Sequence, residues 1–163
     1  MIKKLVIISI SISIIFLSSA LFAQNIRPED VVSITPVSKV KHTKNGTQLD
    51  INFVLSIKDT WHINANKPNG PSLTATEIKI DSSSFYKVIS IKYPPPEMLK
   101  LQFSNKDLAL YEQEAEINVV IEVNKNFTKK MLDIIGQLKY QPCNNQTCLF
   151  PVSKPFNVKA KLK

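Results

Sequence analysis

Residues 48–57 read Gln-Leu-Asp-Ile-Asn-Phe-Val-Leu-Ser-Ile, with an apolar side chain at every second position. Alternation with a period of two is typical of a strand that buries one face and exposes the other. Residues 115–123 repeat the pattern, with Ala115, Ile117, Val119, Ile121 and Val123 on one face. These two stretches predict long, half-buried strands of an antiparallel sheet.

Shorter alternations surround these two stretches and complete the fold prediction. They lie at residues 78–80, 89–93, 138–140 and 156–162, and residues 31–40 can add another. Turn signals rich in Asn, Gly, Pro and Ser separate them. We therefore expect about seven strands in one all-β antiparallel sandwich. Residues 127–135 are the one segment that can form a helical turn, with Thr128 as its cap and Gly136 as its end.

The N-terminus has the three parts of a secretory signal peptide. Lys3 and Lys4 precede an apolar run over residues 5–17, and small residues follow at positions 20–23. We expect a signal peptide over residues 1–23 and a mature domain over residues 24–163, with cleavage after Ala20 or an uncleaved anchor as the alternatives. The prediction is a periplasmic or secreted bacterial protein without stable membrane insertion after cleavage.

The net charge says little about binding partners. The formal charge is +8, and loss of Lys3 and Lys4 with the signal would leave +6. The lysines are scattered and lack the interleaved aromatic residues on which nucleic-acid bases stack. A solvated basic face is therefore predicted, with no nucleic-acid partner, and weak attraction to an anionic membrane or an acidic protein is the alternative.

The only two cysteines lie in Tyr-Gln-Pro-Cys-Asn-Asn-Gln-Thr-Cys-Leu-Phe-Pro, residues 140–151. One intramolecular pairing is possible, and an oxidising compartment permits it. So short a ring would stabilise the fold by about 2 kcal/mol, against more than about 4 kcal/mol for a ring of a hundred residues. Cys143 and Cys148 therefore suit reversible thiol–disulfide exchange better than structural cross-linking. An inert disulfide in a non-catalytic binding module is the alternative.

Trp61 and His62 are expected to start a loop after the strand over residues 49–57. Trp61 is expected in the core, because large aromatic side chains dominate sandwich cores. His62 could assist proton transfer at the thiols, or it could be satisfied by local hydrogen bonds. His42 and His62 show no metal-ligand spacing with the cysteines, so we expect no metal and no cofactor.

Several segments together resemble the N-terminal periplasmic domain of DsbD, the thiol:disulfide interchange protein. They are the cysteine segment at residues 140–151, Thr-Trp-His-Ile-Asn-Ala-Asn-Lys-Pro at 60–68, Tyr-Pro-Pro-Pro at 93–96 and Leu-Tyr-Glu at 110–112. The resemblance implies an immunoglobulin-like sandwich that acts as a component of protein-disulfide reductase chemistry. Its cysteine pair would receive electrons from a DsbD/CcdA-like membrane thiol transporter and pass them to periplasmic thioredoxin-like or other disulfide proteins.

Carried onto this chain, the resemblance makes Cys143 and Cys148 the redox pair, with Tyr140 and His62 as candidate site-lining residues. It also implies a cap loop over residues 99–110 in which Phe103 shields the sulfurs. Two departures stand out. The sequence contains no transmembrane or thioredoxin-like domain, which implies a separate electron donor, and Lys-Leu-Gln at 100–102 replaces the acidic residues expected before the cap aromatic.

Overall fold

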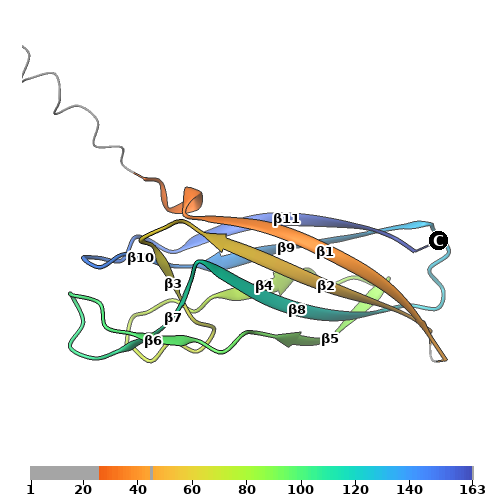
Figure 1. The fold of residues 1–163 in the computed structure, drawn as a ribbon. Coiled ribbons are helices and arrows are strands. Elements are labelled where there is room, and N and C mark those ends of the chain that lie inside the picture. The colour runs from red at the N-terminus through yellow and green to blue at the C-terminus, as the bar shows by residue number, and fades with distance from the viewer. Residues whose placement is uncertain (1–25, 45, 163) are drawn as a thin grey trace, which may run out of the picture.

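The computed structural model describes residues 26–44 and 46–162 (Figure 1). The predicted signal peptide at residues 1–23 lies outside this part of the chain. The elements of the described residues, in chain order, are the short 3₁₀ turn η2 (Pro28–Asp30) and the strands β1 (Val32–Thr43), β2 (Gly46–Ile57), β3 (His62–Asn64), β4 (Glu77–Ile80), β5 (Tyr86–Lys92), β6 (Glu97–Leu99), β7 (Leu108–Glu112), β8 (Glu114–Val123), β9 (Met131–Tyr140), β10 (Pro142–Cys143) and β11 (Val152–Lys161).

The strands form three antiparallel sheets. The first sheet has the order β1-β2-β8-β5, the second sheet β11-β9-β4, and a smaller end sheet β10-β3-β7-β6. The long strands of the first and second sheets run the length of the molecule, and the end sheet lies at one end of them (Figure 1). The chain is therefore an all-β sandwich, as the sequence predicts.

The alternation in the sequence is also the alternation of burial. Along β2 the side chains of Leu49, Ile51, Phe53 and Leu55 are fully buried, and β8 buries Ile117 directly opposite Phe53. The Phe53 ring lies 4.7 Å from the ring of Phe156 on β11, which joins the two large sheets through one core. Each such side chain stabilises the fold by roughly 1.5–3 kcal/mol when fully buried.

The end sheet is built from continuations of the long strands. β3 follows β2 after a four-residue turn, and β7 leads into β8 through Gln113 alone, whose backbone has φ 55°. β9 leads into β10 through Gln141 alone. Strands of both large sheets thus extend into one small sheet, which brings β10 and its Cys143 beside β3.

All seven predicted strands form, and they are the seven strands of the first and second sheets. The strands of the end sheet, between two and five residues long, were not among them. So few residues give no readable alternation. His62 accordingly belongs to β3, and is not in a loop as the sequence suggested.

The predicted helical turn at residues 127–135 is wrong. Met131 to Ile135 form the first half of β9, with Leu132 and Ile134 buried. The outward positions include Met131 and Ile135, which are about half exposed. These two apolar residues on the solvent face hide the period of two and mimic a helical stripe.

Trp61 agrees with the prediction of a core position only in part. Trp61 is only half-buried, although it packs against the main core. The proline run at 94–96 lies between β5 and β6, where the missing backbone donors of proline interrupt no ladder.

We predict that Gly136→Ala destabilises the domain. A Cβ at this position of β9 would lie 2.4 Å from the backbone oxygen of Lys79 and 2.7 Å from the ring of Phe156. Relief of such a clash inside a packed core costs about 1–3 kcal/mol. Urea unfolding should show a lower midpoint, with Ile135→Ala on the exposed face of the same strand as the control. An unchanged midpoint for Gly136→Ala would contradict the packing.

Candidate functional site

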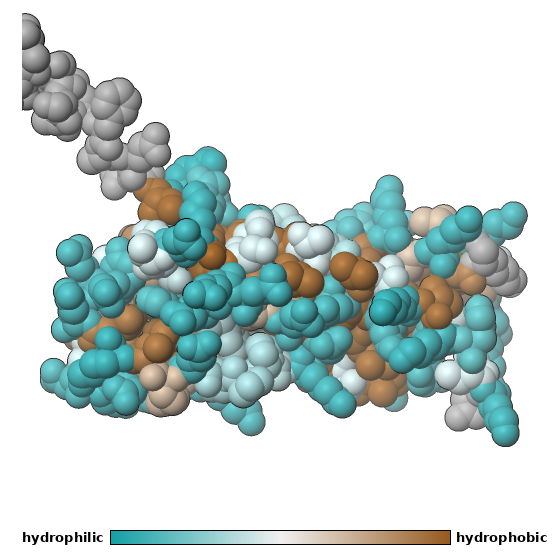
Figure 2. Space-filling model, viewed as in Figure 1, coloured by the Kyte–Doolittle hydropathy of each residue, from teal (hydrophilic) through white to brown (hydrophobic). Residues whose placement is uncertain are grey.

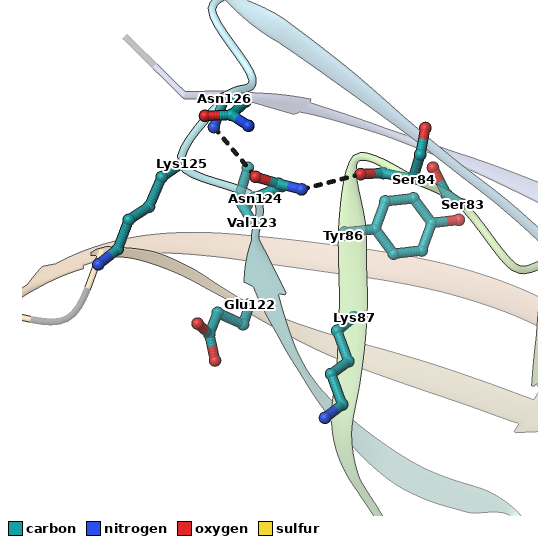
Figure 3. A pocket seen from close by; sticks show the side chains of 9 residues that line it. All are labelled: Ser83, Ser84, Tyr86, Lys87, Glu122, Val123, Asn124, Lys125 and Asn126. Atoms are coloured by element: carbon teal, nitrogen blue, oxygen red, sulfur yellow. Dashed lines mark hydrogen bonds between the residues drawn. The ribbon is translucent and has the colours of Figure 1, made fainter.

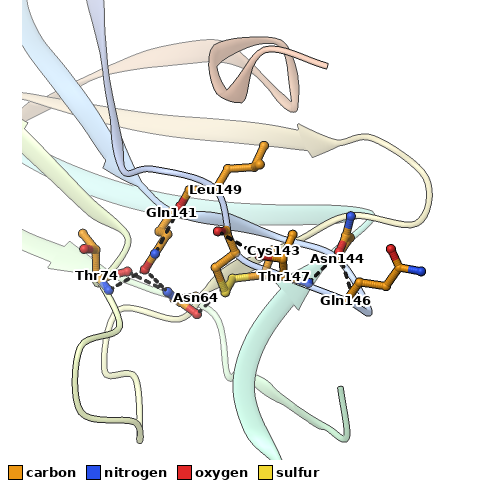
Figure 4. The surroundings of a disulfide bond; sticks show 9 residues. Asn64, Thr74, Gln141, Cys143, Asn144, Gln146, Thr147 and Leu149 are labelled. Atoms are coloured by element: carbon orange, nitrogen blue, oxygen red, sulfur yellow. Dashed lines mark hydrogen bonds between the residues drawn. A yellow bond between two sulfur atoms is a disulfide. The ribbon is translucent and has the colours of Figure 1, made fainter. Parts of the chain in front are cut away.

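Cys143 and Cys148 form a disulfide at the end of the sandwich that carries the end sheet (Figure 4). Cys143 is the last residue of β10 and is fully buried, whereas Cys148 is partly exposed. The intervening turn is closed by the Asn144 amide, which donates to the Thr147 carbonyl oxygen at 2.8 Å. The Asn144 side-chain oxygen accepts from the backbone amides of Gln146 and Thr147 at 2.9 Å. The turn therefore holds the two sulfurs together through backbone contacts that do not require the disulfide.

Two amide side chains fix this loop to the rest of the domain. Buried Asn64 donates through Nδ2 to Gln141 Oε1 at 3.0 Å and to the Thr74 carbonyl oxygen at 3.1 Å. Gln141 in turn donates through Nε2 to the Leu149 carbonyl oxygen at 3.2 Å, on the far side of the cysteines. Asn64 and Gln141 were not identified as site residues from the sequence. Polar residues at buried strand ends are a signal that could have found them.

Asn64 also faces the sulfur of Cys143. Its Oδ1 lies 3.9 Å from Cys143 Sγ. A disulfide sulfur carries no proton, so this contact becomes a hydrogen bond only when Cys143 is a thiol, since S–H is a weak donor. The amide oxygen is thus positioned to stabilise the reduced, uncharged form of the buried cysteine.

An apolar cap covers the disulfide. Leu101, Leu108 and Leu110 form a buried cluster with Cys143, against which Cys148 packs. The Gln102 amide donates to the Asn145 carbonyl oxygen at 3.1 Å, which joins the cap loop to the cysteine turn. Several residues of the stretch 99–110 therefore pack against the cysteine pair and its turn.

Phe103 lies at the edge of the cap. Its side chain is 43% exposed and lines an open groove with Leu73 and Leu108. The cluster around Cys143 instead contains Leu101, which is 2% exposed. The structure thus places Leu101 against the cysteines and Phe103 on the outside of the loop.

The two candidate site-lining residues lie in different places. Tyr140 is fully buried in the main core, where its hydroxyl donates to the Pro28 carbonyl oxygen at 3.1 Å. Burial raises the pKa of Tyr140 to about 12, so the hydroxyl stays protonated as a donor. The structure does not bring it to the sulfurs. His62 on β3, in contrast, is directly opposite Cys143 on β10.

Phe150 is a further residue at this end of the molecule that the sequence analysis did not single out. It lies two residues after Cys148 and is 87% exposed, more than any other large apolar side chain of the described residues. Because aromatic side chains are enriched among the residues that contribute most to protein interfaces, Phe150 is a candidate contact residue.

Other surface features of the described residues do not bring together reactive side chains. The opposite end has a groove between β5 and β8 in which Asn124 joins Ser84 and Asn126 by hydrogen bonds (Figure 3). The face in Figure 2 is mainly hydrophilic with small hydrophobic areas. Nowhere in the described part do three or more His, Cys, Asp or Glu side chains gather as a metal site would require. Nor does any helix there have the length and hydrophobicity needed to cross a bilayer.

Comparison with known proteins agrees with this architecture. Residues 29–160 match the family described as the thiol:disulfide interchange protein DsbD, N-terminal. The fold is similar to the DsbD N-terminal domain of Neisseria meningitidis in the reduced form, with a TM-score of 0.53 and 17% identity over 84% of this chain and 91% of that one. It is also similar to the N-terminal periplasmic domain of ScsB from Proteus mirabilis, with a TM-score of 0.55 and 16% identity over 84% of this chain and 49% of that one. A search of the curated proteins found no match.

The fold and the site together define an immunoglobulin-like β-sandwich domain of the thiol–disulfide exchange class, with its cysteine pair on a short turn at one end. The family match extends over most of the chain. The chain therefore belongs to the family of N-terminal domains of the thiol:disulfide interchange protein DsbD.

We predict that Leu101→Ala speeds reduction of the disulfide by dithiothreitol more than Phe103→Ala does. Truncation of Leu101 opens the apolar cluster that covers Cys143, whereas Phe103 is already 43% exposed. The measurement is the rate of bridge opening at fixed dithiothreitol and pH, with melting temperatures recorded for both variants. A greater effect of Phe103→Ala would instead make the aromatic ring the shield.

Proposed function

We propose that this domain is an exported thiol–disulfide exchange module that passes electrons between a membrane thiol transporter and extracytoplasmic disulfide proteins. The observation that carries the proposal is the asymmetry of the bridge, in which Cys143 is fully buried and Cys148 is partly exposed. A pair with one partly exposed cysteine and one buried cysteine suits an attacking residue and a resolving residue. Cys148 is accordingly the attacking residue and Cys143 the resolving residue.

The exchange conserves electrons and atoms in two steps. The Cys148 thiolate attacks one sulfur of a partner disulfide, which forms a mixed disulfide and releases the partner's other sulfur as a thiolate. Cys143, after losing its proton, then attacks Sγ of Cys148 and releases the partner's remaining thiolate. The partner gains two electrons, and the Cys143–Cys148 disulfide is restored. Reduction by the donor runs the same two steps in reverse.

The proposal also includes the compartment and the partners of the exchange. A signal peptide over residues 1–23 would deliver the domain, residues 24–163, to the periplasm or outside the cell. There a DsbD/CcdA-like membrane protein would supply electrons and thioredoxin-like or other disulfide proteins would receive them. Leu101 forms the inner layer of the cap and Phe103 its outer layer, which keeps unspecific thiols away until a partner docks.

The reduction potential of the bridge separates this proposal from a binding module with a structural disulfide. Structural disulfides usually have potentials below about −300 mV, whereas exchange-active ones lie higher. Because the ring is short and one cysteine is partly exposed, we expect a value above about −300 mV. Equilibration with glutathione or dithiothreitol buffers, followed by alkylation and mass spectrometry, gives the potential. A value well below that limit would favour the structural role.

We predict that Phe150→Ala slows exchange with a protein partner but not with a small thiol. The exposed ring beside Cys148 would lose contact area with any protein that reaches this sulfur. Truncation of an interface aromatic typically costs about 1–2 kcal/mol or more, which corresponds to a drop of about five- to thirtyfold in the second-order rate with a thioredoxin-like protein.

The matched control for Phe150 is Phe85→Ala, which removes a 49% exposed aromatic just before β5, where β5 pairs with the last residue of β8. It should leave both rates unchanged. Equal rates for wild type and Phe150→Ala with the protein partner would remove Phe150 from the docking surface, and a parallel loss with dithiothreitol would assign it to the chemistry or to the fold.

A further inference from the structure

Cys143, His62 and Glu112 lie in one row across the end sheet. Cys143 on β10 is directly opposite His62 on β3, and His62 is directly opposite Glu112 on β7. Residues directly opposite each other in an antiparallel pair project to the same face, with Cβ atoms about 4.5–5.5 Å apart. The sulfur, the imidazole and the carboxylate are therefore successive neighbours on one face of the sheet.

The imidazole in this row is enclosed but incompletely bonded. The side chain of His62 is 14% exposed and that of Glu112 is 29% exposed. His62 Nδ1 lies 3.3 Å from Glu112 Oε2, close enough for an ion pair but not aligned as a hydrogen bond, so Nδ1 is a buried polar atom without a hydrogen-bond partner. The carboxylate of Glu112 is thus the polar group that faces Nδ1 from β7.

His62 and Glu112 are the titratable residues in strand register with Cys143, whereas Lys100, Lys106 and Asp107 of the loop over residues 99–110 are exposed. His62 lines a groove whose other walls are neutral, from Thr60, Gln102 and the cysteine-turn residues 144–146. The charged residues of the preceding turn, Lys58 and Asp59, are exposed. On β7 the charged residue opposite His62 is Glu112, and on β10 the titratable neighbour is Cys143 itself.

The chemistry of Cys143 requires a proton carrier at this place. Cys143 is fully buried in an apolar cluster, where a thiolate is far less stable than a thiol. Yet Cys143 must lose its proton to resolve a mixed disulfide, and it leaves as a thiolate when the bridge is reduced. Histidine is the side chain that gains and loses a proton near neutral pH, and a carboxylate behind it stabilises its charged form.

We propose that His62, supported by Glu112, carries the proton of Cys143 during exchange. The inference rests on the proposed function. When a donor thiolate attacks Cys148 Sγ, the S–S bond breaks, its electron pair moves to Cys143, and the imidazolium of His62 gives its proton to that sulfur. In the opposite direction, neutral His62 takes the proton from the Cys143 thiol while Cys143 attacks Cys148 Sγ. The proton then reaches solvent through the groove that His62 lines.

The test is the pH dependence of bridge reduction by dithiothreitol in the purified protein. Rates are divided by the fraction of dithiothreitol present as thiolate, so that the remaining pH dependence belongs to the protein. For wild type this corrected rate should fall as pH rises from 6 to 9, because the imidazolium is lost. His62→Gln should react at least about tenfold more slowly than wild type at pH 6, since positioned acids and bases typically contribute about 10²–10⁴-fold. The two proteins should converge toward pH 9.

Two further variants make the result specific. Glu112→Gln keeps the shape of the side chain but removes the carboxylate that faces the imidazole, so its corrected rate at pH 6 should fall below that of wild type. His42→Gln is the control, because His42 lies in the β1–β2 hairpin beside Thr47, 3.3 Å from its hydroxyl, and should leave the profile unchanged.

The outcomes separate this proposal from the function on which it rests. A bridge that opens readily with a flat corrected profile in wild type overturns the role of His62 and leaves the exchange function standing. A bridge that resists excess dithiothreitol at every pH overturns both. Circular dichroism would show whether His62→Gln folds. If it does not, the comparison of wild type with Glu112→Gln still tests the proposal. Equal pH profiles for these two proteins would contradict a proton carrier supported by the carboxylate.

Discussion

The crossing of the chain from the second sheet into the end sheet determines where the sulfurs lie. β9 ends at Tyr140, which is held in the main core, and β10 begins at Pro142 with a single residue between the two strands. The intervening Gln141 bonds Asn64 on one side and the Leu149 carbonyl on the other. The position of Cys143 is therefore set by the packing of the long strands and by one buried amide network. The disulfide itself is not needed to place it.

The disulfide stabilises the fold much less than the core does. A ring of the size closed by Cys143 and Cys148 contributes about 2 kcal/mol at most, whereas a single core side chain such as Phe53 contributes a similar amount when fully buried. The core of the two large sheets contains many such side chains. Opening the bridge thus removes a small share of the stabilising interactions, and the domain can keep its fold in both redox states.

The large sheets could be predicted from sequence because they are long enough to repeat their pattern. Residues 48–57 and 115–123 each give four or five alternations, and the helical turn predicted at 127–135 failed only because Met131 and Ile135 put apolar side chains on the solvent face. The end sheet could not be predicted, because two to five residues per strand have no period to read. The cysteines were evident from their spacing. Their neighbours His62, Glu112 and Leu101 come from three separate segments and meet only through strand register and loop packing.

The cap illustrates why a family resemblance carries over only in part. The resemblance led us to expect acidic residues before the cap aromatic, but this chain has Lys100, Leu101 and Gln102 there. Leu101 adds to the apolar cluster around Cys143, and Gln102 contributes a backbone bond to the cysteine turn. A more apolar cap makes a buried thiolate less stable, so the need for a nearby proton carrier grows. On the other side of the cysteine pair, His62 lies opposite Cys143 and Glu112 lies opposite His62, where the proposed proton carrier and its carboxylate stand.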